Sequence, residues 1–205
     1  MKKLFIALLT LTALLAINAQ AQQRTAEEYI KLLEGERRVE NLQVPKVIET
    51  LKIKSNHKIA DIGSGSGLFS RPLAKHVNKG QVYAVDIDQK LLDHVAKTSA
   101  DENLTNVKTI FAAEDDPKLP EPVDLIVIID TMHHIANQPT YVKTLKKYLR
   151  KNGRIVIIDF NKTWPAGHEK MIYKLEDLDG WMKAAGYKKV ESYDFLDNNF
   201  FVVYQ

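Results

Sequence analysis

The chain has 205 residues, of which 45% are hydrophobic and 27% charged, a globular composition that excludes wholesale disorder. Its length suits one domain, and the lack of cysteine excludes disulfides, thiolate metal sites and a cysteine nucleophile. The net charge is +3, and two of the positive charges belong to Lys2 and Lys3. The nearly neutral remainder gives no electrostatic reason to expect a nucleic acid as the main partner.

The first 21 residues have the pattern of a secretory signal peptide. Two lysines precede an apolar run over residues 4–17, and Ala19-Gln20-Ala21 has the small-x-small form of a cleavage site. The run is shorter than the roughly 18–20 apolar residues that a spanning helix needs. We therefore expect export, with a mature domain of residues 22–205 in the periplasm. The alternative is an uncleaved signal sequence that anchors the protein in the membrane.

Beyond the signal, helical and strand patterns alternate along the chain. Thr25 and Glu28 form a capping box at the start of one helix, and Pro45 suits the first turn of the next. Further helices are predicted at residues 68–77, from Asp88 onward, at 140–149 with Gly153 as the stop, and at 175–185. Strands are predicted at residues 58–62, 81–86, 107–111, 124–129, 154–160, 189–195 and 200–204.

This alternation predicts an α/β fold with a doubly wound, seven-stranded and mainly parallel sheet. The last two strands are too close in sequence for a crossover helix, so they must pair as an antiparallel hairpin through a turn at residues 197–199. Residues 161–174 form the longest irregular stretch, and long loops are often functional.

A glycine-rich loop, Asp61-Ile62-Gly63-Ser64-Gly65-Ser66-Gly67, follows the first predicted strand. Glycines between a strand and a helix permit a tight turn and a close approach of the backbone to a ligand. The dinucleotide fingerprint needs its third glycine where Leu68 stands, and the Gly-Lys-Ser/Thr ending of a P-loop is absent. A phosphate cradle is therefore not favoured, and Asp61 would repel a pyrophosphate.

An acidic residue ends the second predicted strand. Asp86 follows Gly67 by nineteen positions, and a carboxylate in that place can accept both hydroxyls of a ribose. Asp88, by contrast, fits the N-cap of the next helix. The glycine loop together with Asp86 predicts a site for an adenosine compound.

These segments resemble the motifs of class I S-adenosylmethionine-dependent methyltransferases. The likeness covers the family's first motif, its ribose-binding strand, the segment that reaches the adenine, and the fourth strand with its exit. In this chain those segments are residues 60–67, 82–86, 113–120 and 123–134. The resemblance implies a Rossmann-like methyltransferase domain within residues 22–205 and S-adenosylmethionine as the cofactor.

The resemblance also implies a set of cofactor-binding residues. The loop glycines would line the methionine and ribose, Asp61 would lie near the methionine ammonium, and Asp130 beside the methionine end. Asp86 would take the ribose hydroxyls. Either Glu114 or Asp115 would contact the adenine, because the usual Gly-Asp pair is replaced by Ala113-Glu114-Asp115. The set comprises Asp61, Gly63, Ser64, Gly65, Gly67, Asp86, Ile87, Glu114, Asp115 and Asp130.

Three histidines are the candidates for catalysis: His133 and His134 after the fourth strand, and His168 in the long loop. Transfer of a methyl group from a sulfonium mainly needs alignment and exclusion of water, and a base only if the acceptor arrives protonated. Imidazole titrates near neutrality and suits that role. The structural alternative is that one of the adjacent pair packs under the sheet, the other caps the next helix, and His168 lies in an ordinary surface loop. No metal-ligating set is predicted.

The acceptor is expected to be a small molecule. The Asn/Asp-Pro-Pro-Tyr/Phe motif of the family's nucleic-acid enzymes is absent after the fourth strand, and the cysteines of arsenic-methylating relatives are missing. The two adjacent histidines resemble those of small-molecule methyltransferases, including quinone-biosynthesis types. A basic cluster within residues 143–154 is either a solvated helix end or a weak contact for an anionic membrane surface.

Two other functions remain open. The export signal favours a protein that holds an adenosine compound without turnover, since S-adenosylmethionine is made inside the cell. A nicotinamide-dependent oxidoreductase is the third candidate, although Leu68 and the C-terminal hairpin argue against it. The oligomeric state is not predicted.

Overall fold

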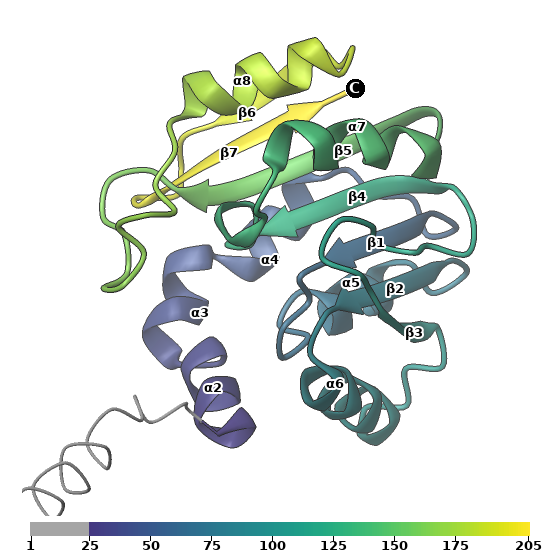
Figure 1. Ribbon diagram of the computed structural model, residues 1–205. Helices are drawn as coiled ribbons and strands as arrows, with labels where there is room; N and C mark the ends of the chain where they lie inside the picture. The colour runs from purple at the N-terminus through teal and green to yellow at the C-terminus, as the bar shows by residue number, and fades with distance from the viewer. Residues whose placement is uncertain (1–24) are drawn as a thin grey trace, which may run out of the picture.

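A computed structural model describes residues 25–205, so the predicted signal peptide lies outside the described residues (Figure 1). Its strands form one sheet in the order β3-β2-β1-β4-β5-β7-β6. All neighbours pair in parallel except β7, which is antiparallel to both β5 and β6. The strands are β1 (Lys58–Ile62), β2 (Gln81–Asp86), β3 (Val107–Phe111), β4 (Val123–Ile129), β5 (Leu149–Phe160), β6 (Lys189–Tyr193) and β7 (Asn199–Tyr204).

Helices cover both faces of this sheet (Figure 1). The α-helices are α2 (Ala26–Leu33), α3 (Glu36–Leu42), α4 (Val44–Thr50), α5 (Ser70–His76), α6 (Gln89–Asp101), α7 (Gln138–Leu145) and α8 (Leu175–Ala184). Two short 3-10 helices are η1 (Met132–His134) and η2 (Lys146–Tyr148). The doubly wound, mainly parallel sheet with its C-terminal hairpin is therefore confirmed.

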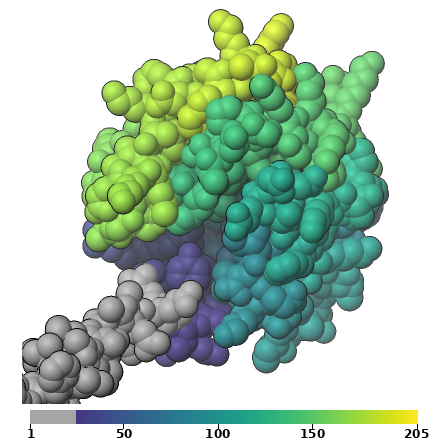
Figure 2. Space-filling view, viewed as in Figure 1, coloured from purple at the N-terminus to yellow at the C-terminus, as the bar shows by residue number. Residues whose placement is uncertain are grey.

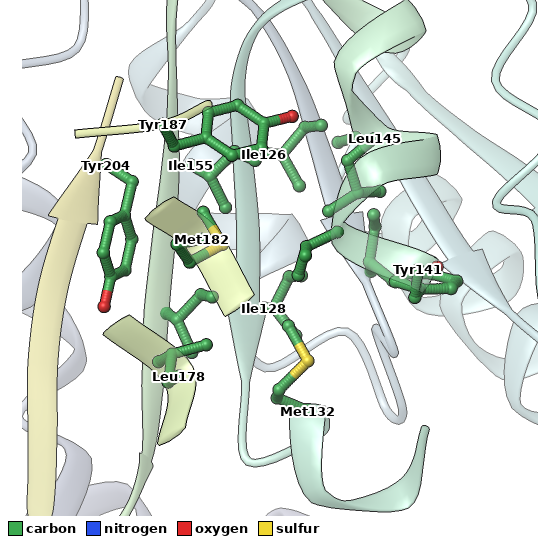
Figure 3. Packing of buried hydrophobic residues seen from close by; sticks show 14 of the residues in the cluster. Ile126, Ile128, Met132, Tyr141, Leu145, Ile155, Leu178, Met182, Tyr187 and Tyr204 are labelled. Atoms are coloured by element: carbon green, nitrogen blue, oxygen red, sulfur yellow. The ribbon is translucent and has the colours of Figure 1, made fainter. Parts of the chain in front are cut away.

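The apolar character of β4 follows from burial on both faces. Leu125 and Val127 pack in a core with residues of α4 and α5. Ile126 and Ile128 belong to a second core, with residues of α7 and α8. Figure 3 shows Ile126 and Ile128 beneath those helices, with Met132 of η1 closing the end of this core.

The strand order places two loops side by side at one edge. β1 lies between β2 and β4, so the chain winds outward through β2 and β3 and then returns to the other side of β1. The strands are parallel, and the loops that leave β1 and β4 therefore share the same edge of the sheet. Such a reversal of winding is where ligands bind in open α/β sheets.

The start of β5 differs from the prediction. The helix expected over residues 140–149 ends at Leu145, η2 follows, and β5 begins at Leu149, so Gly153 lies inside a strand instead of stopping a helix. The pairing with β4 slips here, with Leu149 opposite Val123 but Arg154 opposite Leu125. The register of the two strands skips residues 150–153, and a Cβ at Gly153 would lie 3.0 Å from the Arg150 carbonyl oxygen. Helix α3 was not predicted.

Part of the basic cluster within residues 143–154 pairs with acids of the domain. Lys147, Arg150 and Arg154 form ion pairs with Asp116, Asp124 and Glu191 respectively. The weak contact with an anionic membrane surface stays a prediction. Within residues 25–205, no helix is both long enough and apolar enough to cross a membrane.

Removing a side chain from the double-sided core tests the packing of the central strand. Ile126→Ala is expected to lower the free energy of unfolding by about 2–5 kcal/mol, because the side chain is fully buried and leaves a cavity. Val190→Ala, on the 45% exposed Val190 of the edge strand β6, is the control and should change it by less than about 0.5 kcal/mol. Urea unfolding measures both, and equal losses would contradict the assignment of the core.

Candidate active site

A cavity of about 490 Å³ lies at the carboxyl ends of β1, β2 and β4. Its walls come from the glycine loop, the ends of β2 and β4, the segment after β3 and the N-terminal helices. Figure 2 shows a recess where the purple N-terminal segment meets the teal and green parts of the chain. The volume is within the roughly 300–1,000 Å³ of small-molecule sites.

The glycine loop turns tightly and presses against the loop after β4. Gly63, Gly65 and Gly67 have φ of 70°, 53° and 81°, a region that side chains disfavour. The backbone N–H of Gly63 donates to the Val85 carbonyl, 2.8 Å away. A Cβ on Gly63 would lie 2.2 Å from Cγ2 of Thr131, so no other residue fits without displacement.

The three glycines do not share one role. Gly63 and Gly65 line the cavity, together with Ser64, whose buried hydroxyl has no hydrogen-bond partner within residues 25–205. Gly67 lies off the cavity wall, and a Cβ there would lie 3.0 Å from Val95 of α6. It serves the packing of the loop on that helix.

Asp86 is tied directly to the glycine loop. Its Oδ2 accepts from the backbone N–H of Gly65 at 2.8 Å, and its Oδ1 accepts from that of Asp88 at 3.1 Å. Burial raises the pKa of the Asp86 carboxyl. Asp88 caps α6 through Lys90, as predicted. Ile87 lies beside Asp86 on the cavity wall with 56% of its surface exposed.

Asp61 is a buried carboxylate that lines the cavity. Only 3% of its surface is exposed, and the Ser70 hydroxyl donates to its Oδ2. Burial, together with repulsion from Asp86, raises the pKa of Asp61 to about 6. No ion pair links Asp61 to a basic side chain of the described residues. A ligand cation would compensate this charge.

Asp130 connects the cavity to the N-terminal helices. Nη2 of Arg38, from α3, lies 3.0 Å from its Oδ2, and Asn199 donates to its Oδ1 at 2.7 Å. Burial raises the pKa of Asp130, and the Arg38 charge opposes that rise. Tyr29 and Leu33 of α2 also line the cavity. Sequence reasoning missed all three N-terminal residues, because no motif marks them.

The segment after β3 distinguishes its two acids. Glu114 lines the cavity, whereas Asp115 is exposed and lies outside its lining. The segment is held by Asp116, which accepts from Tyr148 and pairs with Lys147 at 2.7 Å. Of the two candidates for an adenine contact, the geometry favours Glu114.

The three predicted histidines come together, although only His134 lines the cavity. The ring centroids of His133 and His134 are 4.1 Å apart, and that of His168 lies 5.2 Å and 5.3 Å from them. Burial and the neighbouring imidazoles lower the pKa of His134 to about 4. It is neutral at pH 7 and is a weak base there. Helix α7 is capped by Asn137, not by His134.

His133 is buried against a residue that sequence reasoning missed. Asp159 is fully buried in β5 and accepts from His133 Nδ1 at 2.8 Å, from the His133 backbone N–H and from the Tyr173 hydroxyl. Burial raises the pKa of Tyr173, so its hydroxyl stays protonated and donates. A lone aspartate near the carboxyl end of an apolar strand was the available signal.

Comparison with known proteins places the chain among methyltransferases. A family model described as a methyltransferase domain matches residues 33–192. The chain is 25% identical to (S)-coclaurine N-methyltransferase of Thalictrum flavum subsp. glaucum, over 65% of this chain and 36% of that protein. It is 22% identical to a ubiquinone/menaquinone biosynthesis C-methyltransferase of Paraburkholderia phytofirmans, over 73% and 62%. The chain thus spans between about a third and two thirds of these curated relatives.

Solved structures share the fold. A SAM dependent methyltransferase from Aquifex aeolicus superposes with a TM-score of 0.78 at 23% identity, over 89% of this chain and 98% of that one. A coclaurine N-methyltransferase bound to N-methylheliamine and SAH gives 0.63 at 17% identity, over 76% and 51%. The [4+2]-cyclase SpnF gives 0.65 at 17% identity, over 75% and 59%. These similarities support the Rossmann-like fold. The reaction has to be inferred from the residues of the site.

The close approach of the two loops predicts a large effect of a single methyl group. Gly63→Ala should cost about 1–2 kcal/mol for its left-handed backbone and about 1–3 kcal/mol more for overpacking against Thr131. Gly167→Ala is the matched control, because Gly167 also has a positive φ but its Cβ would meet nothing within 4 Å. Urea unfolding of both variants separates the cost of the left-handed backbone from the cost of overpacking. An equal loss of unfolding free energy in Gly63→Ala and Gly167→Ala would show that the loops after β1 and β4 do not touch.

The raised pKa of Asp61 predicts a pH-dependent loss of stability. The folded protein holds this proton up to about pH 6, against a usual value of 3.8, so ionisation opposes folding increasingly as pH rises between these values. The cost above pH 6 is of the order of 3 kcal/mol. Asp61→Asn should therefore gain stability over the wild type between pH 4 and pH 7 in chemical unfolding. A difference that stays constant with pH would contradict the buried charge.

Proposed function

This chain belongs to the family of methyltransferase domains, and from that premise we propose that it transfers the methyl group of S-adenosylmethionine to a small-molecule acceptor by in-line displacement. The observation that carries the proposal is the convergence of the glycine loop and the Asp86 carboxylate on one cavity. That pairing is the arrangement that binds an adenosine ribose.

The residues of the cavity fit the parts of the cofactor. Asp86 would accept the ribose hydroxyls, with Gly65 keeping the loop backbone close. Asp61, a buried carboxylate that forms no ion pair with a basic side chain of the described residues, would face the methionine ammonium. Glu114 and the exposed apolar side chain of Ile87 would flank the adenine. The unpartnered hydroxyl of Ser64 offers one further polar contact.

When bound, S-adenosylmethionine supplies a methyl group on a positively charged sulfur, which is an activated donor. The protein then has to orient the acceptor toward the methyl group and to exclude water. Arg38 ties α3 to Asp130 and places α2 and α3 over the cavity. His134 presents a neutral imidazole that can hydrogen-bond an acceptor atom, but its lowered pKa makes it an orienting group more than a base.

The acceptor class rests on the relatives. The curated relatives are named as an N-methyltransferase of (S)-coclaurine and as C- and O-methyltransferases of ubiquinone or menaquinone biosynthesis. We infer a small organic acceptor for this chain and leave its methylated atom open. A protein of this fold that binds the cofactor without methylation is the second candidate, and the [4+2]-cyclase among the structural neighbours shows that the fold hosts other chemistry. Turnover with any acceptor would exclude it.

We also propose that the protein is exported through residues 1–21. The support is the basic start, the apolar run and the Ala19-Gln20-Ala21 site in the sequence. N-terminal sequencing of the protein from fractionated cells tests this. A periplasmic species that begins at Gln22 supports cleavage, a membrane-bound one that begins at Met1 supports anchoring, and a cytosolic protein that begins at Met1 contradicts export.

Replacing each acid by alanine tests which of them bind the cofactor. Asp86→Ala should weaken S-adenosylmethionine and S-adenosylhomocysteine by about 1–3 kcal/mol, because the ribose hydroxyls lose their acceptor. Glu114→Ala should weaken both ligands, whereas Asp115→Ala, the matched control on the neighbouring exposed acid, should not. Calorimetric titration measures all three.

NAD serves as the ligand control in the same titration. Unchanged affinity for S-adenosylmethionine in Asp86→Ala would show that the ribose site is misplaced. Binding of NAD in preference to S-adenosylmethionine would favour the oxidoreductase instead.

A further inference from the structure

Three imidazoles meet beside the cavity from two separate segments. His133 and His134 lie in η1, after β4, and His168 lies in the loop between β5 and α8. One ring nitrogen of each lies within 4.8 Å of a nitrogen of both others. Nitrogen ligands of a tetrahedral zinc are about 3.3 Å apart, given Zn–N bonds of about 2.0–2.1 Å.

Two of the rings already have the outer contacts typical of metal ligands. His133 Nδ1 lies 2.8 Å from Asp159 Oδ1, and His168 Nδ1 lies 3.2 Å from the Pro165 carbonyl oxygen. In both cases the contact uses Nδ1 and fixes the tautomer that leaves the lone pair of Nε2 free. A carboxylate or carbonyl behind the imidazole is the arrangement that orients metal-binding histidines.

The third observation is an unsatisfied polar atom. His133 is only 3% exposed, and its Nε2 is buried with no hydrogen-bond partner in the part of the chain that the structure describes. Leaving a buried acceptor unpaired costs about 1–3 kcal/mol. The carboxylate of Asp159 behind it is fully buried too, and its partners are hydrogen-bond donors and an imidazole. A cation at the imidazole cluster would satisfy Nε2 and compensate that charge.

We propose that His133, His134 and His168 bind a divalent transition metal ion, of which zinc is the best match. Imidazole suits zinc, copper, iron and nickel, whereas calcium and magnesium prefer oxygen ligands. Three protein ligands leave a fourth position open, as in catalytic zinc sites. A metal here ties the loop of residues 161–174 to the exit of β4. From the sequence, these histidines were predicted as candidates for catalysis and no metal-ligating set was predicted, so metal binding is a different role for the same residues.

The site has a consequence for the acceptor, and this consequence alone rests on the proposed function. His134 belongs to both the cluster and the cavity wall, so the open position lies close to bound acceptor. An acceptor hydroxyl or thiol that coordinates the metal would have its pKa lowered, and its proton would pass to solvent. The acceptor class implied is one with an ionisable oxygen or sulfur.

Metal binding is tested without cofactor or acceptor, so its failure is distinguishable from failure of the proposed function. The protein, free of any affinity tag that contains histidine, is titrated with Zn²⁺ in a calorimeter, and with Co²⁺ by visible absorption. One equivalent should bind with micromolar or tighter affinity, and Co²⁺ should give the absorption of a tetrahedral site. His168→Ala removes a half-buried loop ligand and should weaken binding at least about tenfold. His76→Ala, an exposed histidine at the end of α5, is the matched control and should bind like the wild type.

Fluorescence locates the bound ion. Trp164 lies with its ring 5.4 Å from that of His133, and the only other tryptophan of the chain is Trp181. In Trp181→Phe, Cu²⁺ should quench the remaining tryptophan at one equivalent, and the additional change His168→Ala should abolish this quenching. The absence of saturable binding, equal affinity in His168→Ala and wild type, or quenching that persists without His168 would each overturn the proposal.

Discussion

The contact between the loops that leave β1 and β4 is the constraint on which the site depends. Gly63 lies so close to Thr131 that the first loop position admits no side chain. This contact exists because β1 and β4 are neighbours although two strands separate them in sequence. The pairing of β1 with β2 brings Asp86 to the Gly65 backbone, and the reversal of winding brings Asp130 to the far side of the cavity.

Several buried acids lie in or near the cavity, and they differ in how far neighbouring groups compensate their charge. Asp130 pairs with Arg38, and Asp159 is surrounded by hydrogen-bond donors. Burial, with a smaller contribution from the neighbouring Asp86 carboxylate, raises the pKa of Asp61, and the hydrogen bond from the Ser70 hydroxyl only partly opposes this. A protein keeps such a buried charge at a cost to stability, and buried groups with shifted pKa values concentrate at functional sites. The acid with the poorest internal compensation is the one that the account assigns to a ligand cation.

The sequence predicted what is encoded locally and missed what depends on packing between distant segments. The alternation of strand and helix patterns along the chain was sufficient to predict the sheet, and the spacing from Gly67 to Asp86 was sufficient to bring that carboxylate to the glycine loop. Arg38 reaches Asp130 across 92 positions, and no local pattern encodes that contact. The slip between β4 and β5 arises from pairing, so the predicted boundary at residue 154 was wrong. The sequence alone could not show which of Glu114 and Asp115 lines the cavity. The contact of His168 with His133 likewise depends on the tertiary structure.

The most direct test of the central claim is a crystal structure of the protein with S-adenosylhomocysteine. The ribose hydroxyls should lie at the Asp86 carboxylate, the ammonium should face Asp61, and the adenine should lie between Ile87 and Glu114. The loop backbone at Gly63 and Gly65 should lie against the ligand without rearrangement, because the cavity is already shaped by its contact with Thr131. A ligand bound elsewhere, or one in the cavity with its ribose away from Asp86, would contradict the account.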